Sequence, residues 1–502
     1  MDALLTDFAA QRLTEGGGRC LEALTVALSQ AFEGGEKRWY ASTLELQLAS
    51  SALCNACRSV PTLHVRVDST TPITLWDPDD HVPSRVPAVY PLGLTWLLSA
   101  DDLWRIISVK KRWKWLEYLR LPGESRSVRV ESVVWPKRLK RLVLEKGGVT
   151  CVKAVGWPDS LQQLSLGDDF NEPVAGVMWP ASLQQLSFGD SFNQSVAGVV
   201  WPTSLQQLFF GENFNQSMAG DVWPASLEQL SFGKRFNQPV AGDVWPASLQ
   251  QLSFGEDFDQ PVARVMWPAS LRQLSFGRRF NQPIARVVWS ASLQQLSFGT
   301  LFNRSIARVV WPASLQELSF GTFFNQSISG LVWPASLRQL SFGEYFDQPI
   351  AGVVWPPSLQ QLSFAGEFNQ SVAGVVWPAS LRQISFGVSF NHPVAGVVWP
   401  ASLQKLSFGS CFNQTISGVV WPASLQQLSF GICFNQPISE VMWPASLQYL
   451  SFGRGFNQPV AGVVWPASLQ QLSFGSWFDQ PISGVVWPVS LRSVTRNGST
   501  LL

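Results

Sequence analysis

The stretch that decides the fold reads Trp157-Pro-Asp-Ser-Leu-Gln-Gln-Leu-Ser-Leu-Gly-Asp-Asp-Phe-Asn-Glu-Pro-Val-Ala-Gly-Val-Met178. Close copies follow one another, and the tryptophan that opens each copy recurs every 22 residues from Trp135 to Trp487. A fixed period without insertions requires each unit to superimpose on the next, because a looped-out residue would break the register of a stack. The sequence therefore predicts a solenoid.

The first half of the unit carries an L-x-x-L-x-L pattern at Leu161, Leu164 and Leu166, and most later units place Phe in the third position. The alternation of Leu164, Ser165 and Leu166 sends apolar side chains to one face and serine to the other, which is typical of a strand. The Trp-Pro dipeptide cannot continue a helix or a central strand. We therefore expect one short parallel strand per unit, with a return path of turns and extended backbone.

The predicted fold class is mainly β: a parallel-β, leucine-rich-repeat-like solenoid of about seventeen turns with a 22-residue period, preceded by a smaller, partly helical N-terminal region. We expect a helical region over residues 1–60, an irregular proline-rich segment with a short strand over 61–100, and a degenerate N-terminal cap over 101–134. The solenoid spans 135–496, and residues 497–502 form a tail. No closing module is evident at this end, so the sequence favours end-to-end self-association.

The composition excludes several classes of protein. Charged residues make up 14% of the chain and the formal net charge is +1, whereas soluble proteins average about 25% charged residues. A disordered polyampholyte and a strongly basic nucleic-acid binder are therefore not expected. Polar residues interrupt every apolar cluster, so no membrane span is expected. Six cysteines are too sparse for a disulfide framework and no signal peptide is visible, which predicts an intracellular, cytoplasmic location.

A polar column accompanies the strand. Asn or Asp follows the second Phe of every copy from Asn171 to Asp479. Such a side chain can hydrogen-bond to the loop backbone of adjacent turns, which has no strand ladder of its own. We assign this structural ladder to Asn171, Asn193, Asn215, Asn237, Asp259, Asn281, Asn303 and Asn325.

The repeat resembles a known family. The segment FNQPVAGVVWPASLQQLSFG, from Phe456 to Gly475, closely resembles the FNIP repeat, a short relative of the leucine-rich repeat with the signature Phe-Asn-x-Pro-Ile and a Pro-x-Ser-Leu-x-x-Leu stretch. The resemblance covers roughly residues 135–496. It departs from the pattern where Ser or Thr replaces Pro, as at Ser195 and Thr415. The resemblance implies an intracellular binding array without catalytic activity.

Variation between units indicates where a partner would bind. The strand face is monotonous, but the two residues after the strand glycine differ in every unit. Acidic and basic pairs come first and apolar or aromatic pairs later, and exposed aromatic residues are enriched at protein interfaces. The candidates at this position are Lys234, Arg235, Leu301, Phe323, Tyr345, Ile432 and Trp477. The alternative interpretation is drift at an unconstrained turn.

Arginines form a second candidate surface. Arg264, Arg286 and Arg308 occupy the same position of consecutive units, and Arg278 and Arg279 lie in the same interval. Like charges on adjacent turns are unfavourable unless water solvates them or an anion binds them. The functional interpretation is an unidentified protein partner with an acidic surface, and the alternative is a tolerated solvent-facing column.

The sequence offers no catalytic constellation. The three histidines do not recur with the period and no glycine-rich phosphate loop precedes a helix, so we predict neither an enzyme nor a cofactor. Cys54 and Cys57 with His64 and His81 are the one candidate metal cluster. Structural zinc sites have four ligands at tighter spacing, so we predict no metal site, and two ordinary cysteines are the alternative interpretation.

Two further functions stay open. Residues Leu98 to Trp113 faintly resemble the end of an F-box, and relatives that pair such a box with these repeats are substrate adaptors for ubiquitin ligases. The usual Leu-Pro opening is absent. Residues 105–146 form a basic stretch that could touch RNA or an anionic surface, although nucleic acid is an unlikely partner because a single basic collar is usually solvated.

Overall fold

The computed structural model describes residues 63–66, 94–97, 117–121, 135–144, 152–220 and 222–501. These residues form strands, turns and extended segments, and none of them is helical. The chain divides into two compact units. Unit 1 comprises the chain up to Glu172 together with Val177–Leu186, and unit 2 comprises Pro173–Gly176 and the chain from Ser187. The helices predicted for residues 1–60 lie outside the described residues.

Unit 1 contains five parallel strands. They are β1 (Leu63–Arg66), β2 (Leu94–Leu97), β3 (Tyr118–Leu121), β4 (Arg141–Leu144) and β5 (Gln163–Ser165). Each pairs in parallel with the next, from β1 to β5. The pairs between β3 and β4 join residues 23 apart, such as Leu119 and Leu142, whereas the pairs between β4 and β5 join residues 22 apart. The segment before residue 135 thus contributes strands of its own.

Unit 2 contains the regular turns. Strand β6 (Gln185–Ser187) crosses the boundary between the units. The strands that follow are β7 (Gln207–Phe209), β8 (Gln229–Ser231), β9 (Gln251–Ser253), β10 (Gln273–Ser275), β11 (Gln295–Ser297), β12 (Glu317–Ser319), β13 (Gln339–Phe342), β14 (Gln361–Phe364), β15 (Gln383–Ser385), β16 (Lys405–Ser407), β17 (Gln427–Ser429), β18 (Tyr449–Ser451), β19 (Gln471–Phe474), β20 (Ser493–Arg496) and β21 (Ser499–Thr500).

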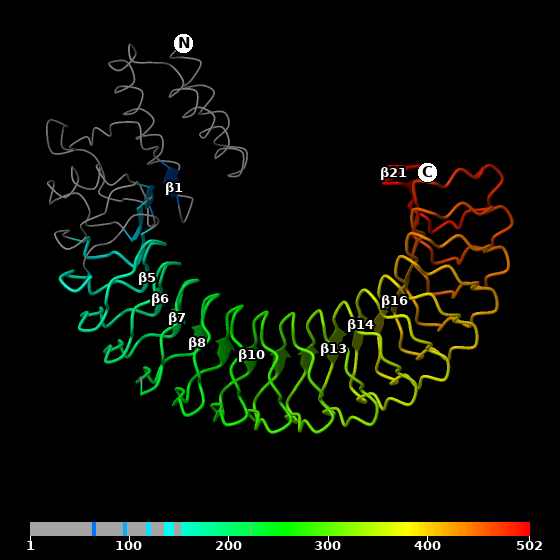
Figure 1. Cartoon of the computed structure of the whole chain (residues 1–502). Coiled ribbons are helices and arrows are strands. Elements are labelled where there is room, and N and C mark those ends of the chain that lie inside the picture. Colours follow the sequence, from blue (N-terminus) through cyan, green and yellow to red (C-terminus); the bar gives the residue numbers. More distant parts are fainter. Residues whose placement is uncertain are drawn as a thin grey trace, which may run out of the picture. The chain divides into compact units, whose positions relative to one another are not determined.

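The predicted parallel solenoid with its 22-residue period is confirmed. From β7 to β20, consecutive strands pair in parallel and in register, as where Leu274 faces Leu252 on one side and Leu296 on the other. The turns of unit 2 follow a curve, with the strands on its inner side (Figure 1). Every turn therefore presents the same position to the same side of the stack.

Each turn has three straight sides joined by three corners, as the turn that starts at β9 shows. Two-residue corners stand at 256–257, 263–264 and 269–270. They separate the strand side from a second side at 258–262 and a third side at 265–268. We name the three surfaces of unit 2 the strand face, the asparagine face and the valine face, after the residues that point outward from each. The strand face is the inner one, so the other two faces are flanks that meet at the corner equivalent to 263–264.

The interior is a set of aromatic and aliphatic columns. Phe280 is fully buried and its ring stacks on Phe258 and Phe302 of the adjacent turns, at centroid distances of 6.1 and 6.0 Å. Within its own turn it stacks on Phe276 at 4.0 Å. Such offset pairs add to the apolar area that each ring buries. A single turn has no such neighbours, which is why the repeat is stable only as a stack.

Close backbone packing explains the glycine that follows nearly every strand from β5 to β19. A Cβ at Gly277 would lie 1.8 Å from the carbonyl oxygen of Gly255 in the preceding turn. A side chain can enter that space only if the two turns shift apart, and Ala365 is the one exception to glycine at this position from Gly167 to Gly475. This glycine determines how closely two adjacent turns approach at the corner that follows the strand. The two residues of that corner are the ones that vary between turns.

A hairpin ends unit 2, where the sequence analysis predicted a plain tail. Strand β21 pairs antiparallel with β20. Asn497 and Gly498 form the turn with φ of 49° and 80°, which matches the Asn-Gly preference of tight hairpins. The hairpin pairs Thr495 and Arg496 of β20 with Thr500 and Ser499, a contact that was not predicted from the sequence.

Candidate binding surfaces

The asparagine face carries the polar column. The Oδ1 atom of Asn215 accepts hydrogen bonds from the backbone N–H of Asn237, at 2.9 Å, and from Nε2 of Gln238, at 3.0 Å. Asp259 accepts the same pair from Asn281 and Gln282, both at 2.9 Å. The role therefore requires only an acceptor, which both side chains supply. This explains why Asp replaces Asn at some turns.

The strand face of unit 2 is a polar groove. The side chains at its base alternate between buried leucine and half-buried glutamine and serine, and the groove encloses about 470 Å³ along β7 to β15. Serine hydroxyls bond to one another between turns, as from Ser341 to Ser319 at 2.9 Å. The lining is nearly identical in every turn, so this surface offers hydrogen bonds along its length and little discrimination between positions.

A backbone ladder fixes the corner between the strand face and the asparagine face, which we name the variable corner. The N–H of Phe323 donates to the carbonyl of Thr300 at 2.9 Å, and that of Tyr345 donates to Thr322 at 2.9 Å. Equivalent bonds join this corner in each pair of turns from Asn213 to Trp477. Because the backbone alone holds the corner, the side chains there are free to differ without a structural cost.

Apolar candidates meet at three consecutive variable corners. Leu301, Phe323 and Tyr345 are 37%, 41% and 45% exposed. The rings of Phe323 and Tyr345 stack with centroids 4.8 Å apart and planes 5° from parallel. Further along, Ile432 is half exposed and Trp477 lies beneath the guanidinium of Arg454 at 5.4 Å. The structure thus brings three of the five apolar candidates together and leaves the other two apart.

The charged candidates at the variable corner alternate in sign along the column. Lys234 lies 3.9 Å from Glu256, and Arg279 lies 3.2 Å from Asp257. These pairs join adjacent turns and are largely exposed, so each contributes at most about 1 kcal/mol. Arg235 and Arg278 are exposed at the same corners. The charge of this stretch is therefore partly balanced within the chain.

The arginine column stands at the corner between the asparagine face and the valine face. Arg264, Arg286 and Arg308 are exposed there. In most other turns a glycine occupies the position, with φ between 68° and 97°. That region favours glycine, so the three arginine turns use a different corner conformation. Glu440 is the one acidic residue at this position among the described turns. In the arginine turns and at Glu440, a charged residue replaces the glycine that the other turns use. The corner is otherwise uncharged.

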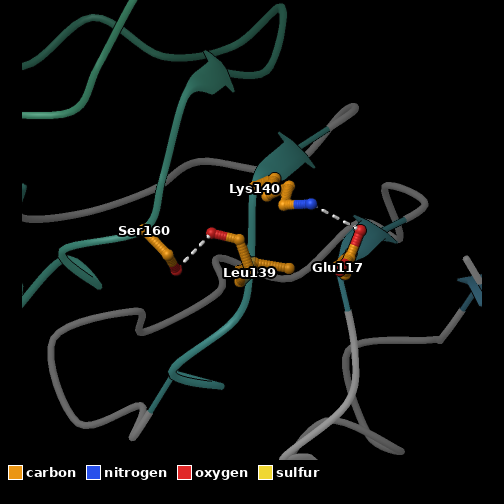
Figure 2. Close-up of polar contacts among 4 residues, drawn as sticks. All are labelled: Glu117, Leu139, Lys140 and Ser160. Atoms are coloured by element: carbon orange, nitrogen blue, oxygen red, sulfur yellow. Dashed lines mark hydrogen bonds and ion pairs between the residues drawn. The ribbon is translucent and has the colours of Figure 1, made fainter. Parts of the chain in front are cut away.

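The basic stretch at the start of the solenoid is partly paired. Figure 2 shows Nζ of Lys140 against the Glu117 carboxylate, 2.9 Å away, and the Ser160 hydroxyl donating to the carbonyl of Leu139 at 2.8 Å. The guanidinium of Arg141 lies over the ring of Tyr118, 5.0 Å from its centroid. Two charges of the predicted collar thus have partners within unit 1, which weakens the prediction of an RNA or anionic-surface site. The F-box-like segment 98–113 and Cys54, Cys57 and His81 lie outside the described residues.

One surface was not predicted from the sequence. The residue before each tryptophan from Trp179 to Trp487 is Val or Met, and in unit 2 it is 75–86% exposed. Its neighbours on both sides are buried, as Val287 and Trp289 are beside Val288. No sequence signal marked it as exposed, because a position that never carries a polar residue from Met178 to Val486 is typical of an interior. We name this row of side chains the valine column.

Two classes of site find no support in the part of the chain that the structure describes. No group of three His, Cys, Asp or Glu side chains there could hold a metal ion. Nor does that part include a helix with the length and apolar character needed to cross a bilayer.

Comparison with known protein families identifies the repeat. The family model of the FNIP repeat matches residues 192–235, 214–257, 236–279, 280–323, 324–366, 368–411 and 412–455. The chain belongs to the FNIP repeat family. The matched segments run through the FNIP turns of unit 2 that hold the apolar cluster, the arginine column and most of the valine column.

One solved structure supports the leucine-rich-repeat-like fold. CroV588, described as a novel circular leucine-rich-repeat protein, is 36% identical with a TM-score of 0.67. That match covers 80% of the FNIP chain and 65% of CroV588, so this chain spans less than two thirds of that protein. An internalin from Listeria monocytogenes is 12% identical with a TM-score of 0.29, covering 71% of this chain and 86% of its own. A leucine-rich-repeat protein of Leptospira interrogans is 17% identical with a TM-score of 0.32, covering 65% and 86%. No curated protein sequence matches the chain.

Proposed function

We propose that this FNIP solenoid is a non-catalytic protein-binding scaffold, and that its partner docks on the variable corner and the adjoining strand face. The main support for the proposal is that the backbone and the side chains of the variable corner have separate roles. The backbone ladder holds the position of every corner, while the side chains are exposed and differ from turn to turn. A scaffold needs this arrangement, because it must change its contacts without losing its fold.

The apolar cluster is the proposed anchor. Leu301, Phe323 and Tyr345 expose apolar surface on adjacent turns, and the stacked pair is held rigidly by its own ring contact. Rigid aromatic side chains lose little conformational freedom on binding and often dominate interface energies. The glutamine and serine side chains of the strand face would supply hydrogen bonds around this anchor.

Affinity capture followed by measurement with the purified partner tests the proposal. The Phe323→Ser/Tyr345→Ser variant should weaken binding at least about tenfold, because interface aromatics are frequent hot spots. The matched control is Met442→Ser/Val464→Ser, which removes exposed apolar groups from the valine face and should leave the affinity unchanged. Equal affinities for the wild type and the aromatic variant would refute the docking site.

The arginine column is a second candidate surface, for an acidic protein. Its support is the run of three exposed arginines at a corner where other turns keep glycine. Reversal of all three charges should abolish binding to an acidic partner, and rising salt should weaken the binding of the wild-type chain. Binding that depends on neither change would refute this second proposal.

A further inference from the structure

The valine column is a continuous apolar surface on one flank of unit 2. Its members are Val200, Val222, Val244, Met266, Val288, Val310, Val332, Val354, Val376, Val398, Val420, Met442, Val464 and Val486. None is less than 75% exposed. The column has one member in every turn, and no charged side chain interrupts it.

The area of the column exceeds what a monomer usually exposes. A fully exposed side chain of this size offers on the order of 100 Å² of apolar surface, so the fourteen members, each 75–86% exposed, together offer roughly 1,100 Å². The largest apolar patch of a soluble monomer is about 300–600 Å². Two such columns facing each other would bury about 2,000 Å², and a stable interface needs about 1,200–2,000 Å² in total. The area is therefore enough for a dimer even where contact is incomplete.

The spacing of the column points to its occupant. The buried tryptophans beside it stack at centroid distances near 6.4 Å, as between Trp245 and Trp267 or Trp289 and Trp311. Side chains repeated at this spacing leave a gap between each pair of turns, and a second row with the same spacing can fill the gaps. A second copy of this chain carries such a row. We propose that two copies of the protein associate through their valine columns.

Charge at the neighbouring corner sets the orientation of the two copies. Arg264 and Glu440 occupy the same corner position in turns that lie eight periods apart. A parallel dimer in register would place Arg264 beside Arg264 of the second copy, which is unfavourable. In an antiparallel dimer centred on Val354, the turn that carries Arg264 faces the turn that carries Glu440, and the symmetry forms this ion pair twice. The two remaining arginines of the column then face glycine corners, Gly418 and Gly396.

This inference is separate from the proposed docking at the variable corner, because the two surfaces lie on different sides of each turn. Its failure would leave the proposed function intact, and the reverse also holds. It also differs from end-to-end association, which would use the strand edge at β20 and β21.

Sedimentation of the full-length chain tests the dimer. At micromolar concentration the wild type should sediment as a species of twice 55.6 kDa. The variant Val332→Asp/Val354→Asp/Val376→Asp should dissociate at least about 100-fold more readily, because the interface would bury unpaired charge. These residues are 78–86% exposed in one chain, so the unfolding midpoint of the variant should match that of the wild type when both are measured at a dilution where the wild type is monomeric. The matched control is Val388→Asp, which makes the same substitution at the variable corner and should leave the dimer intact.

Charge exchange tests the orientation. Arg264→Glu and Glu440→Arg should each weaken the dimer, by about tenfold, and the double variant should restore it. A monomeric wild type, or a dimer indifferent to the three aspartates, would overturn the proposal. Binding of a monomeric wild type to phosphatidylcholine vesicles, lost with the same three aspartates, would overturn it in favour of a lipid surface. A dimer weakened by both single reversals and not restored by the double variant would overturn the antiparallel arrangement.

Discussion

Removal of one acceptor from the asparagine face tests how the stack is held together. The variant Asn215→Ala takes away the Oδ1 atom that accepts from the backbone N–H of Asn237 at 2.9 Å and from Nε2 of Gln238 at 3.0 Å. The glutamine keeps its bond to the Asn215 carbonyl at 3.1 Å. The N–H of Asn237 is left without this acceptor between two packed turns.

The cost follows from these contacts. A buried donor left unpaired costs about 1–3 kcal/mol, and a lost side-chain bond costs about 0.5–1.5 kcal/mol. The column is half-buried and water can reach part of it, so we expect a loss of about 2 kcal/mol. The variant Asn215→Asp keeps the acceptor and should stay within about 0.5 kcal/mol of the wild type, since charge-assisted acceptance offsets the added charge.

Urea unfolding followed by tryptophan fluorescence measures both changes, and native-state hydrogen exchange at the Asn237 amide locates them. The alanine variant should exchange faster at that amide, and the aspartate variant should match the wild type. Equal midpoints for alanine and aspartate would refute the reasoning, because the two differ in the acceptor that the account invokes.

Two other predictions concern the core. Phe280→Ala should destabilise the chain by about 3–5 kcal/mol in urea unfolding, because it empties a buried ring site, whereas Val288→Ala at an exposed position should change stability by less than about 0.5 kcal/mol in the monomer. Asp243 is 6% exposed, its Oδ2 has no hydrogen-bond partner, and burial raises its pKa above 3.8. Because the folded state then holds the proton more tightly than the unfolded state, the penalty is absent below pH 3.8, grows as the pH rises towards the raised pKa and persists at neutral pH. Asp243→Val should therefore stabilise the chain at pH 7, by about 1–3 kcal/mol, and this gain should shrink in unfolding measurements made below pH 4.

The repeat period made the register of the stack predictable. A period without insertions left one arrangement, in which equivalent residues pair, and Leu274 indeed faces Leu252 and Leu296. The position of the variable corner also followed from the sequence, because constant residues flank it. The conformation of the corner that carries glycine or arginine did not follow from the sequence, because the arginine turns reverse the chain without a positive φ.

The surfaces were harder to predict than the core. In a turn with three sides, a row of valines beside a row of tryptophans is typical of an interior, and only the structure shows that Val288 points outward while Val287 and Trp289 point inward. The closing hairpin did have a sequence signal, in Asn497-Gly498, that the solenoid pattern obscured. The stacking of Phe323 on Tyr345 depends on side-chain rotation, which the period does not determine.

The central claim is that equivalent residues of successive turns lie side by side, and the native cysteines test it most directly. Cys411 and Cys433 are both exposed and free, and the N–H of Cys433 donates to the carbonyl of Ser410 at 2.7 Å. Parallel neighbours are about 4.8 Å apart, within the Cα separation of about 4.4–6.8 Å that a disulfide spans. Mild oxidation followed by peptide mass spectrometry should therefore find the Cys411–Cys433 bridge. In the variant Cys433→Ser/Trp477→Cys the two thiols stand three turns apart, and no bridge should form. Failure of the first pair to bridge, or equal bridging of both pairs, would contradict the in-register stack.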